Sequence, residues 1–363
     1  MLPSISSFAV AWRQWHRPLM LFTVAMAALA VFSAAGLVVD GRTVNGDPVW
    51  LKPLKFALSF GVYGLSAAWL LSLLPASRTG RPAGARTGTA LALCSFLEVA
   101  LVVFQAARGT RSHFNGDTAF DAAVFNAMAA LAGGIWLASA AVAVLVLRHR
   151  VPDPALTLAI RAGLLIALAG MAIAFPMGGG AQHDPATASL GAHTVGAPDS
   201  PGGLPVTGWS LEGGDLRVPH FLGMHALQLL PLVLWAVDAG AARRPRLARP
   251  EVRYRLVRAT ALAAGGVLAL VSWQALRGQP FTAPDLATWT ALAVLGLSVA
   301  VATLHAVAGP PRRPGASAPR AADSGEDLGE GPGEDPAGGS GVPGEVRAGA
   351  RAEAGPDRTE VDA

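Results

Sequence analysis

Long apolar blocks alternate with short polar segments along the whole chain up to about residue 308. A block of roughly 20 apolar residues is long enough to cross a bilayer as a helix, and a helix satisfies its own backbone hydrogen bonds in lipid. The pattern predicts an all-α integral membrane protein, a bundle of about eight transmembrane helices. We expect the spans at residues 18–39, 54–74, 87–107, 122–147, 156–177, 219–237, 254–276 and 286–308.

The composition is typical of a chain that is surrounded in part by lipid. Hydrophobic residues make up 52% of the 363 positions and charged residues only 14%, whereas soluble domains average about 25% charged residues. The bias towards Ala, Gly and Arg is typical of a GC-rich bacterial genome. The single cysteine, Cys94, excludes an intrachain disulfide.

Arginines concentrate in the N-terminal segment and in every second loop, namely 78–86, 148–150, 243–253 and 312–313. The other loops hold most of the acidic residues. Because basic loops stay in the cytoplasm, this distribution predicts that both termini are cytoplasmic. An even number of spans is consistent with this, since it places both termini on the same side. We therefore expect a multi-pass protein of the cell (plasma or inner) membrane.

The first span has a second interpretation, a cleaved signal peptide with small residues at 32–35. Its apolar run is longer than an ordinary signal-peptide core, and an uncleaved helix preserves the alternation of loop charge. The retained helix is the expectation.

The segment 309–363 differs from the rest of the chain. It holds eleven acidic residues and six arginines, a net charge of −5, against +9 for residues 1–308. With almost no large apolar residues it lacks the material for a core, so we predict a disordered acidic Gly/Pro-rich cytoplasmic tail after a transmembrane domain at 1–308. The basic charge of the membrane domain is explained by its loops, and no nucleic-acid partner is expected.

Two similar pentapeptides hint at an internal duplication. QAARG at 105–109 ends the third span and QALRG at 274–278 ends the seventh, and the second and sixth spans both open with a proline followed by a phenylalanine. Spans four apart run in the same direction, so such repeats are parallel. The alternative is a chance match in a sequence of low complexity.

The sixth span carries the most unusual polar residues. Pro219 suits a helix start, and His220 follows it. His225 and Gln228 are three residues apart, share one helix face, and lie roughly 9 and 13 Å below the helix entry. Polar side chains at that depth usually face a cavity or a cofactor, or else form a hydrogen bond between helices.

Further polar candidates lie at a similar depth or near the same membrane face. Glu98 is near the middle of the third span, where a carboxyl group is protonated or paired. Both lysines of the chain, Lys52 and Lys55, lie in segment 50–56. This segment either binds an anion or a substrate carboxylate through its lysines or anchors the helix at the interface, and the place of Lys55 inside the span favours binding. These positions predict an outward-facing polar pocket between the third and sixth helices.

Two outer loops complete the set of candidates. The loop at 105–117 contains Arg108 and His113 and is dense in hydrogen-bonding residues, as functional loops and merely structural loops both are. The loop at 178–218 contains His183 next to Asp184, and also His193, but the spacing fits no zinc motif. The predicted substrate-binding residues are His225, Gln228, Glu98, Lys55, Arg108, His113 and His220, and the candidate metal or haem ligands are His220, His225 and His113.

The chain lacks a Walker motif, a GxGxxG fingerprint, an HExxH motif and a CxxCH haem-attachment motif. Three hypotheses remain, of which transport of a small solute is the first. The second is a membrane enzyme or redox protein that uses histidines as metal or haem ligands or as acid/base groups. The third is a sensor or assembly protein that acts through its tail. The sequence names no cofactor, and the expected partners are the lipid bilayer and a small-molecule ligand at the outer face.

Overall fold

A computed structural model describes residues 15–75, 80–149, 151–178, 188–199 and 203–309 of the chain. The predicted tail beyond Gly309 and the pair His183 and Asp184 lie outside these residues, so the predictions made for them stay predictions.

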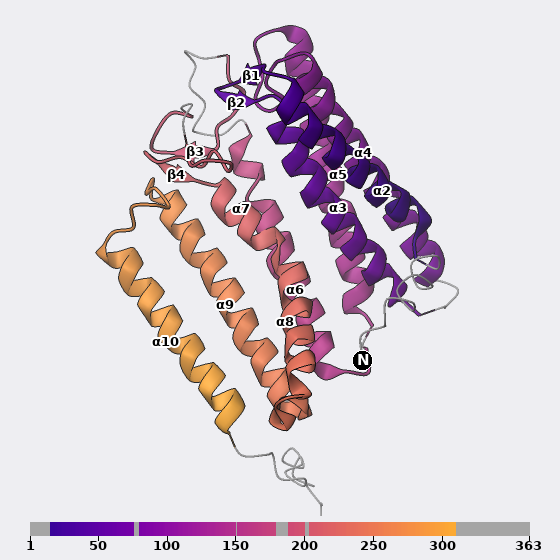
Figure 1. Ribbon diagram of the computed structural model, residues 1–363, viewed down its shortest axis with the longest axis vertical. Helices are drawn as coiled ribbons and strands as arrows, with labels where there is room; N and C mark the ends of the chain where they lie inside the picture. Colours follow the sequence, from indigo (N-terminus) through magenta and orange to yellow (C-terminus); the bar gives the residue numbers. More distant parts are fainter. Residues whose placement is uncertain (1–14, 76–79, 150, 179–187, 200–202, 310–363) are drawn as a thin grey trace, which may run out of the picture. The chain divides into compact units, whose positions relative to one another are not determined.

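Helices make up most of the described structure, and the strands are short. Among the residues that the structure describes, seven helices are long and apolar enough to cross a membrane, and a bent pair, α7 and α8, brings the number to eight if it counts as one span. This confirms a mostly helical chain with the apolar helices of a multi-pass membrane protein (Figure 1). The helices are α2 (Arg17–Val39), α3 (Leu51–Ser72), α4 (Gly80–Ala107), α5 (Ala119–Leu147), α6 (Pro154–Ala172), α7 (Arg217–Met224), α8 (Ala226–Ala241), α9 (Pro250–Leu276) and α10 (Leu286–Ala308), with 3-10 turns η1 (Phe175–Met177) and η2 (Pro245–Ala248).

The sixth predicted span is not one straight helix. It breaks at His225 into α7 and α8, whose axes differ by 43°. His225 is both the C-cap of α7 and the N-cap of α8. The amide of Gln228 donates to the His225 carbonyl three residues earlier, which tightens this turn. Pro231 contributes, because it has no N–H to offer the carbonyl of Leu227 and its ring crowds that carbonyl.

Two short antiparallel hairpins lie at the same end of the helices (Figure 1). The first pairs β1 (Thr43–Val44) with β2 (Asp47–Pro48) around Asn45 and Gly46, which both have positive φ, as a two-residue hairpin turn requires. The second pairs β3 (Thr194–Val195) with β4 (Gly214–Asp215). We call this end the hairpin end, and the opposite end, which holds the connection 242–249, the arginine-rich end.

The helices form two groups with the same internal packing. In the first half, α2 packs against α3 and α4, and α5 packs against α4. In the second half, α6 packs against the α7/α8 pair and α9, and α10 packs against α9. In each half a hairpin directly precedes the second span, α3 or α7. The halves meet where α5 packs against α6.

Glycines allow the closest approach within the second half. A Cβ atom built on Gly170 of α6 would lie 2.6 Å from the Cα of Gly223 on α7, and one on Gly163 would lie 3.1 Å from the backbone of Leu227. Small residues at such crossings are typical of helix packing in membranes, where close van der Waals contact replaces hydrophobic exclusion. These contacts hold the bent pair α7/α8 against α6.

The two similar pentapeptides adopt the same helix cap. Gly109 follows α4 with φ +71° and Gly278 follows α9 with φ +73°. The Gly109 amide bonds the Ala106 carbonyl at 2.9 Å, and the Gly278 amide bonds the Ala275 carbonyl at 2.9 Å. In each case the next amide bonds the carbonyl of the buried glutamine five residues earlier. This is the Schellman arrangement, which satisfies the last carbonyls of a helix.

The side chains around the two caps also correspond. Gln105 and Gln274 each donate to the backbone carbonyl six residues ahead. Arg108 pairs with Asp121 in the first turn of the next helix, α5, and Arg277 pairs with the N-cap of the next helix, Asp285. Each arginine also lies over the aromatic ring four residues before it. Agreement at this level of detail supports internal duplication over a chance match.

The glycine caps provide a test of local strain. We expect Gly109→Ala to lower the free energy of unfolding by roughly 1 kcal/mol, since a left-handed conformation disfavours any residue with a Cβ atom. The control is Gly133→Ala in α5, a helical position where a Cβ atom meets nothing within 4 Å. Thermal unfolding in detergent measures both variants. A Gly109→Ala protein as stable as the control would contradict this account of the cap.

Candidate functional site

Two small cavities lie where the halves of the protein meet. We call this junction, formed by α3 and α5 on one side and α6 and α8 on the other, the seam. A cavity of about 10 Å³ near its middle is lined by Tyr63, Ala67, Leu70, Ser139, Val142, Leu164, Ala167, Leu168, Met171 and Leu227. A cavity of about 20 Å³ nearer the arginine-rich end is lined by Leu73, Leu74, Val146, His149, Val151, Thr157, Ile160 and Arg161. Each holds about one water molecule, so the seam is closed here.

Polar side chains lie along the same seam. The Tyr63 hydroxyl and the Ser139 hydroxyl are 2.6 Å apart and link α3 to α5. Gln228 of α8 donates from Nε2 to the Ser66 hydroxyl of α3 at 3.1 Å, while its Oε1 is buried without a hydrogen-bond partner. Unsatisfied polar atoms are costly in an apolar layer and are therefore rare there. Of these two contacts, the one between Gln228 and Ser66 joins the two halves.

Basic side chains and histidines from both halves gather at the hairpin end. Lys52 of α3 interacts electrostatically with Arg217 of α7, and His113 interacts with Lys52, His193 and His220. The Phe56 ring contacts the His113 ring with centroids 5.8 Å apart. We call Lys52, His113, His193, His220 and Arg217 the hairpin-end cluster. It combines cations and imidazoles beside the end of the seam.

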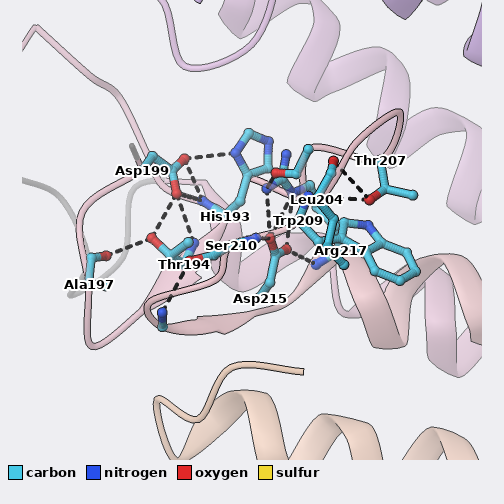
Figure 2. Close-up of polar contacts among 12 residues, drawn as sticks. His193, Thr194, Ala197, Asp199, Leu204, Thr207, Trp209, Ser210, Asp215 and Arg217 are labelled. Carbon is cyan, nitrogen blue, oxygen red and sulfur yellow. Dashed lines mark hydrogen bonds and ion pairs between the residues drawn. The ribbon is translucent and has the colours of Figure 1, made fainter. Parts of the chain in front are cut away.

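His193 is held in one orientation by an aspartate. Its Nδ1 lies 2.7 Å from Asp199 Oδ2, and Asp199 also accepts from the backbone amides of His193 and Thr194 (Figure 2). The Phe114 ring lies against the imidazole, with centroids 4.8 Å apart. When Nδ1–H of His193 donates to the Asp199 carboxylate, the unprotonated Nε2 remains available as a base.

Arg217 is anchored by a buried carboxylate. Asp215, which is fully buried, receives hydrogen bonds from Nε and Nη2 of Arg217 and from the amide of Ser210 (Figure 2). Arg217 Nη2 also donates to the Gly208 carbonyl. The aspartate ends strand β4 and the arginine begins α7, so the second hairpin fixes the position of the guanidinium.

The loop at 203–209 lies against the start of α3. Lys55 Nζ donates to the Val206 carbonyl at 2.9 Å. Val206 has φ +68°, a conformation in which a β-branched residue is a clear outlier. Such strain persists only when surrounding contacts hold it in place, and it concentrates at functional sites. Trp209 at the end of the loop packs against Phe281 of the second half.

The structure distributes the predicted site residues over different settings. His113 and His220 lie in the hairpin-end cluster, and His220 Nδ1 is 2.9 Å from the Gly170 carbonyl. Gln228 lies in the seam, whereas His225 at the bend is exposed. Lys55 binds the loop carbonyl. The structure brings together only part of the predicted set.

Two of the predicted residues are in the first half, away from the sixth span. Arg108 is held by Asp121 and belongs to the cap of α4. Glu98 is buried on α4, which packs against α2, α3 and α5, while α7 and α8 pack against α6 and α9. The Glu98 Oε2 atom has no hydrogen-bond partner. The third and sixth spans are thus on either side of α3 and the seam rather than packed against each other.

Sequence reasoning considered Lys52 only together with Lys55, as an anion ligand of segment 50–56, and selected Lys55 alone as a site residue. It did not select the pair His193 and Asp199 or the contact of Tyr63 with Ser139. The weak signal for Lys52 was its place beside Lys55 in a chain with only two lysines. Nothing in the sequence links Tyr63 to Ser139, 76 positions away.

No three His, Cys, Asp or Glu side chains among the described residues are placed to hold a metal ion. His113 and His220 belong to the cluster, but they do not form such a group with His225. The residues His183 and Asp184 fall outside the described ranges. The described side chains therefore give no support to the metal-site prediction.

Burial lowers the pKa of two loop histidines. The pKa of His113 falls well below its ordinary value of 6.5 because the ring is desolvated and because Lys52 is nearby. Burial also lowers the pKa of His193, although Asp199 opposes this. Burial disfavours the charged form of Asp199 itself, but hydrogen bonds from His193 and Thr194 outweigh it and lower that pKa. Both imidazoles are therefore neutral at pH 7.

Acid should destabilise the protein through these histidines. Below pH 6.5 the unfolded chain binds a proton at His113 that the folded chain does not, so stability falls as the pH drops from 7.5 to 5.5. We expect the thermal midpoint to fall by roughly 2–4 °C per histidine over this range. His113→Gln should remove one such contribution. If that variant keeps the full pH dependence, His113 is not buried in its neutral form.

No protein-family model matches the chain, and neither a curated protein nor a solved structure shows significant similarity to it.

Proposed function

We propose that the chain is a multi-pass protein of the cell membrane that carries a small solute across the bilayer along the seam. The observation that carries this proposal is the position of the two small cavities, both of which lie in the seam between the halves. Two polar contacts lie beside the middle cavity, between Tyr63 and Ser139 and between Gln228 and Ser66. A closed path of this kind is what a carrier presents between its open states.

Three features of the fold support a carrier. Many transporters consist of repeated halves, bind substrate near the middle of the membrane where the halves meet, and use a broken helix there. This chain has two halves with matching caps and matching packing. Its broken span, α7 and α8, borders the seam, and Gln228 lies three residues beyond the break.

The proposed orientation follows from the loop charges. Basic loops remain in the cytoplasm, so the arginine-rich end faces inward, both termini are cytoplasmic, and the hairpin end faces outward. In this orientation the hairpin-end cluster is the outer entrance of the path. Arg161, whose Nε atom is buried without a partner, lines the cavity nearest the cytoplasm.

Two substitutions on one helix test the path. Ala167 of α6 is buried and lines the middle cavity, while Ala169, two positions on, is exposed on the same helix. We expect Ala167→Leu to fill the cavity and abolish solute flux, at a cost of roughly 1–3 kcal/mol in stability from overpacking. Ala169→Leu should leave both unchanged.

Flux is measured by light scattering of proteoliposomes that shrink in a solute gradient and reswell as the solute enters. The assay uses a panel of small solutes, and the flux of each solute is compared between the two variants. Equal flux through Ala167→Leu and Ala169→Leu would place the path elsewhere. Absence of flux for every solute through the unaltered protein would reject the carrier.

A second candidate function is a membrane enzyme with His193 as an acid/base group. The observation that favours it is the hydrogen bond that orients His193 on Asp199 beside two cations of the cluster. An oriented neutral imidazole is the usual general base in proteins. The purified protein would then turn over a small ester or phosphoester, and Asp199→Asn would abolish turnover without changing flux.

A Soret band in the absorption spectrum of the purified protein would instead support a redox protein.

A further inference from the structure

Three cations lie within electrostatic reach of one another at the hairpin end. Lys52 and Lys55 come from α3 in the first half, and Arg217 begins α7 in the second. Lys55 Nζ and Arg217 Nη2 donate to two carbonyls of one loop, those of Val206 and Gly208. Lys52 is three residues before Lys55 on the same helix face, so the three charges act on one another. Like charges held together destabilise a folded protein unless anions compensate for them.

The partners of these cations are unequally shared. Arg217 has the buried Asp215 at 2.6 Å. Lys55 has the Val206 carbonyl, and Asp47 is near enough to act on its charge. Lys52, in contrast, forms neither an ion pair nor a hydrogen bond within the part of the chain that the structure describes.

Lys52 lies beside two aromatic rings and within electrostatic reach of one acidic residue. Its ammonium lies 5.9 Å from the centre of the Phe56 ring, which is stacked with Phe60. Glu98 is the acidic group that acts on Lys52, yet no ion pair joins the two. Aromatic rings lower the local dielectric, so the attraction between Lys52 and an incoming anion is stronger here than in water.

His113 adds a second donor beside Lys52. Its Nδ1 lies 3.2 Å from the Ser112 hydroxyl, and its ring contacts Phe56. When Ser112 donates to Nδ1, the Nε2–H of the neutral imidazole is available to a ligand. A cation, a neutral donor and an aromatic wall together match an anion that carries a small apolar group.

We propose that the hairpin-end cluster binds a small monocarboxylate anion, with its carboxylate between Lys52 of the first half and Arg217 of the second. This inference deepens the proposed function by naming the substrate class of the outer entrance. Because both halves contribute one cation each, the bound anion also joins them across the seam. Binding itself does not depend on transport, so the two proposals fail separately.

Acetate is the probe for this site. In detergent, we expect sodium acetate to raise the thermal unfolding midpoint and to change the tryptophan fluorescence, since Trp50 and Trp209 lie on the segments that carry Lys52 and Arg217. Sodium chloride at the same ionic strength is the reference. An equal response to both salts would overturn the carboxylate assignment.

Lys52→Met should weaken the apparent affinity for acetate at least tenfold, and Lys52→Arg should keep it within about threefold, because the charge is retained. The matched control is Arg42→Gln at the same end, where the arginine is already paired with Asp40. We expect Lys52→Met to remain folded, because it removes an unpaired cation from a cationic cluster, so a loss of acetate affinity in this variant reports on the site. Unchanged acetate affinity in that variant would overturn the site.

Proteoliposome flux separates this inference from the carrier. A protein that binds acetate through Lys52 but moves no solute keeps the anion site and loses the carrier function. A protein that moves other solutes while acetate neither binds nor competes keeps the carrier function and loses the anion site.

Discussion

The absence of water in the apolar layer of a membrane is the constraint on which this structure depends. Each polar group that a helix carries there must find its partner within the protein, because lipid offers none. The ends of α4 and α9 meet this demand with identical glycine caps, in which a buried glutamine and a paired arginine close the last turn. Such caps depend on local backbone geometry, so the similar pentapeptides at 105–109 and 274–278 adopt the same one.

Few buried side-chain atoms escape this rule in the described residues. They are Ser33 Oγ, Ser95 Oγ, Glu98 Oε2, Arg111 Nε, Arg161 Nε and Gln228 Oε1. Gln228 and Arg161 lie at the seam, one near its middle and one beside the cavity towards the arginine-rich end. A protein tolerates unsatisfied groups where they serve function, since each costs roughly 1–3 kcal/mol. The other four atoms lie in the first half, on α2, on α4 and in the loop that follows α4.

The two halves give the seam its chemical character. Each half places a hairpin before its second span, and each second span opens with a basic residue, Lys52 in α3 and Arg217 in α7. The halves are not identical in this region, because the second hairpin carries the long insertion that contains Val206 and Trp209. That insertion holds Lys55 and leaves Lys52 as the cation without a partner. The cluster therefore draws its cations from both halves, and neither half would form it by itself.

The sequence by itself determined the helical architecture, since the length of an apolar block sets whether it spans a bilayer. The last span was predicted at 286–308, and α10 occupies Leu286–Ala308. The likeness of segments 105–109 and 274–278 was also visible, because a cap is encoded within a few neighbouring residues. The tertiary structure decided which helices are neighbours, that Arg108 belongs to a cap, that His225 is exposed, and that Lys52 lies beside Arg217. The physical reason is that a helix apolar on every side carries no periodic signal for its buried face. Side-chain partners 76 or 162 residues apart, such as Tyr63 with Ser139 and Ser66 with Gln228, follow only from how the helices pack.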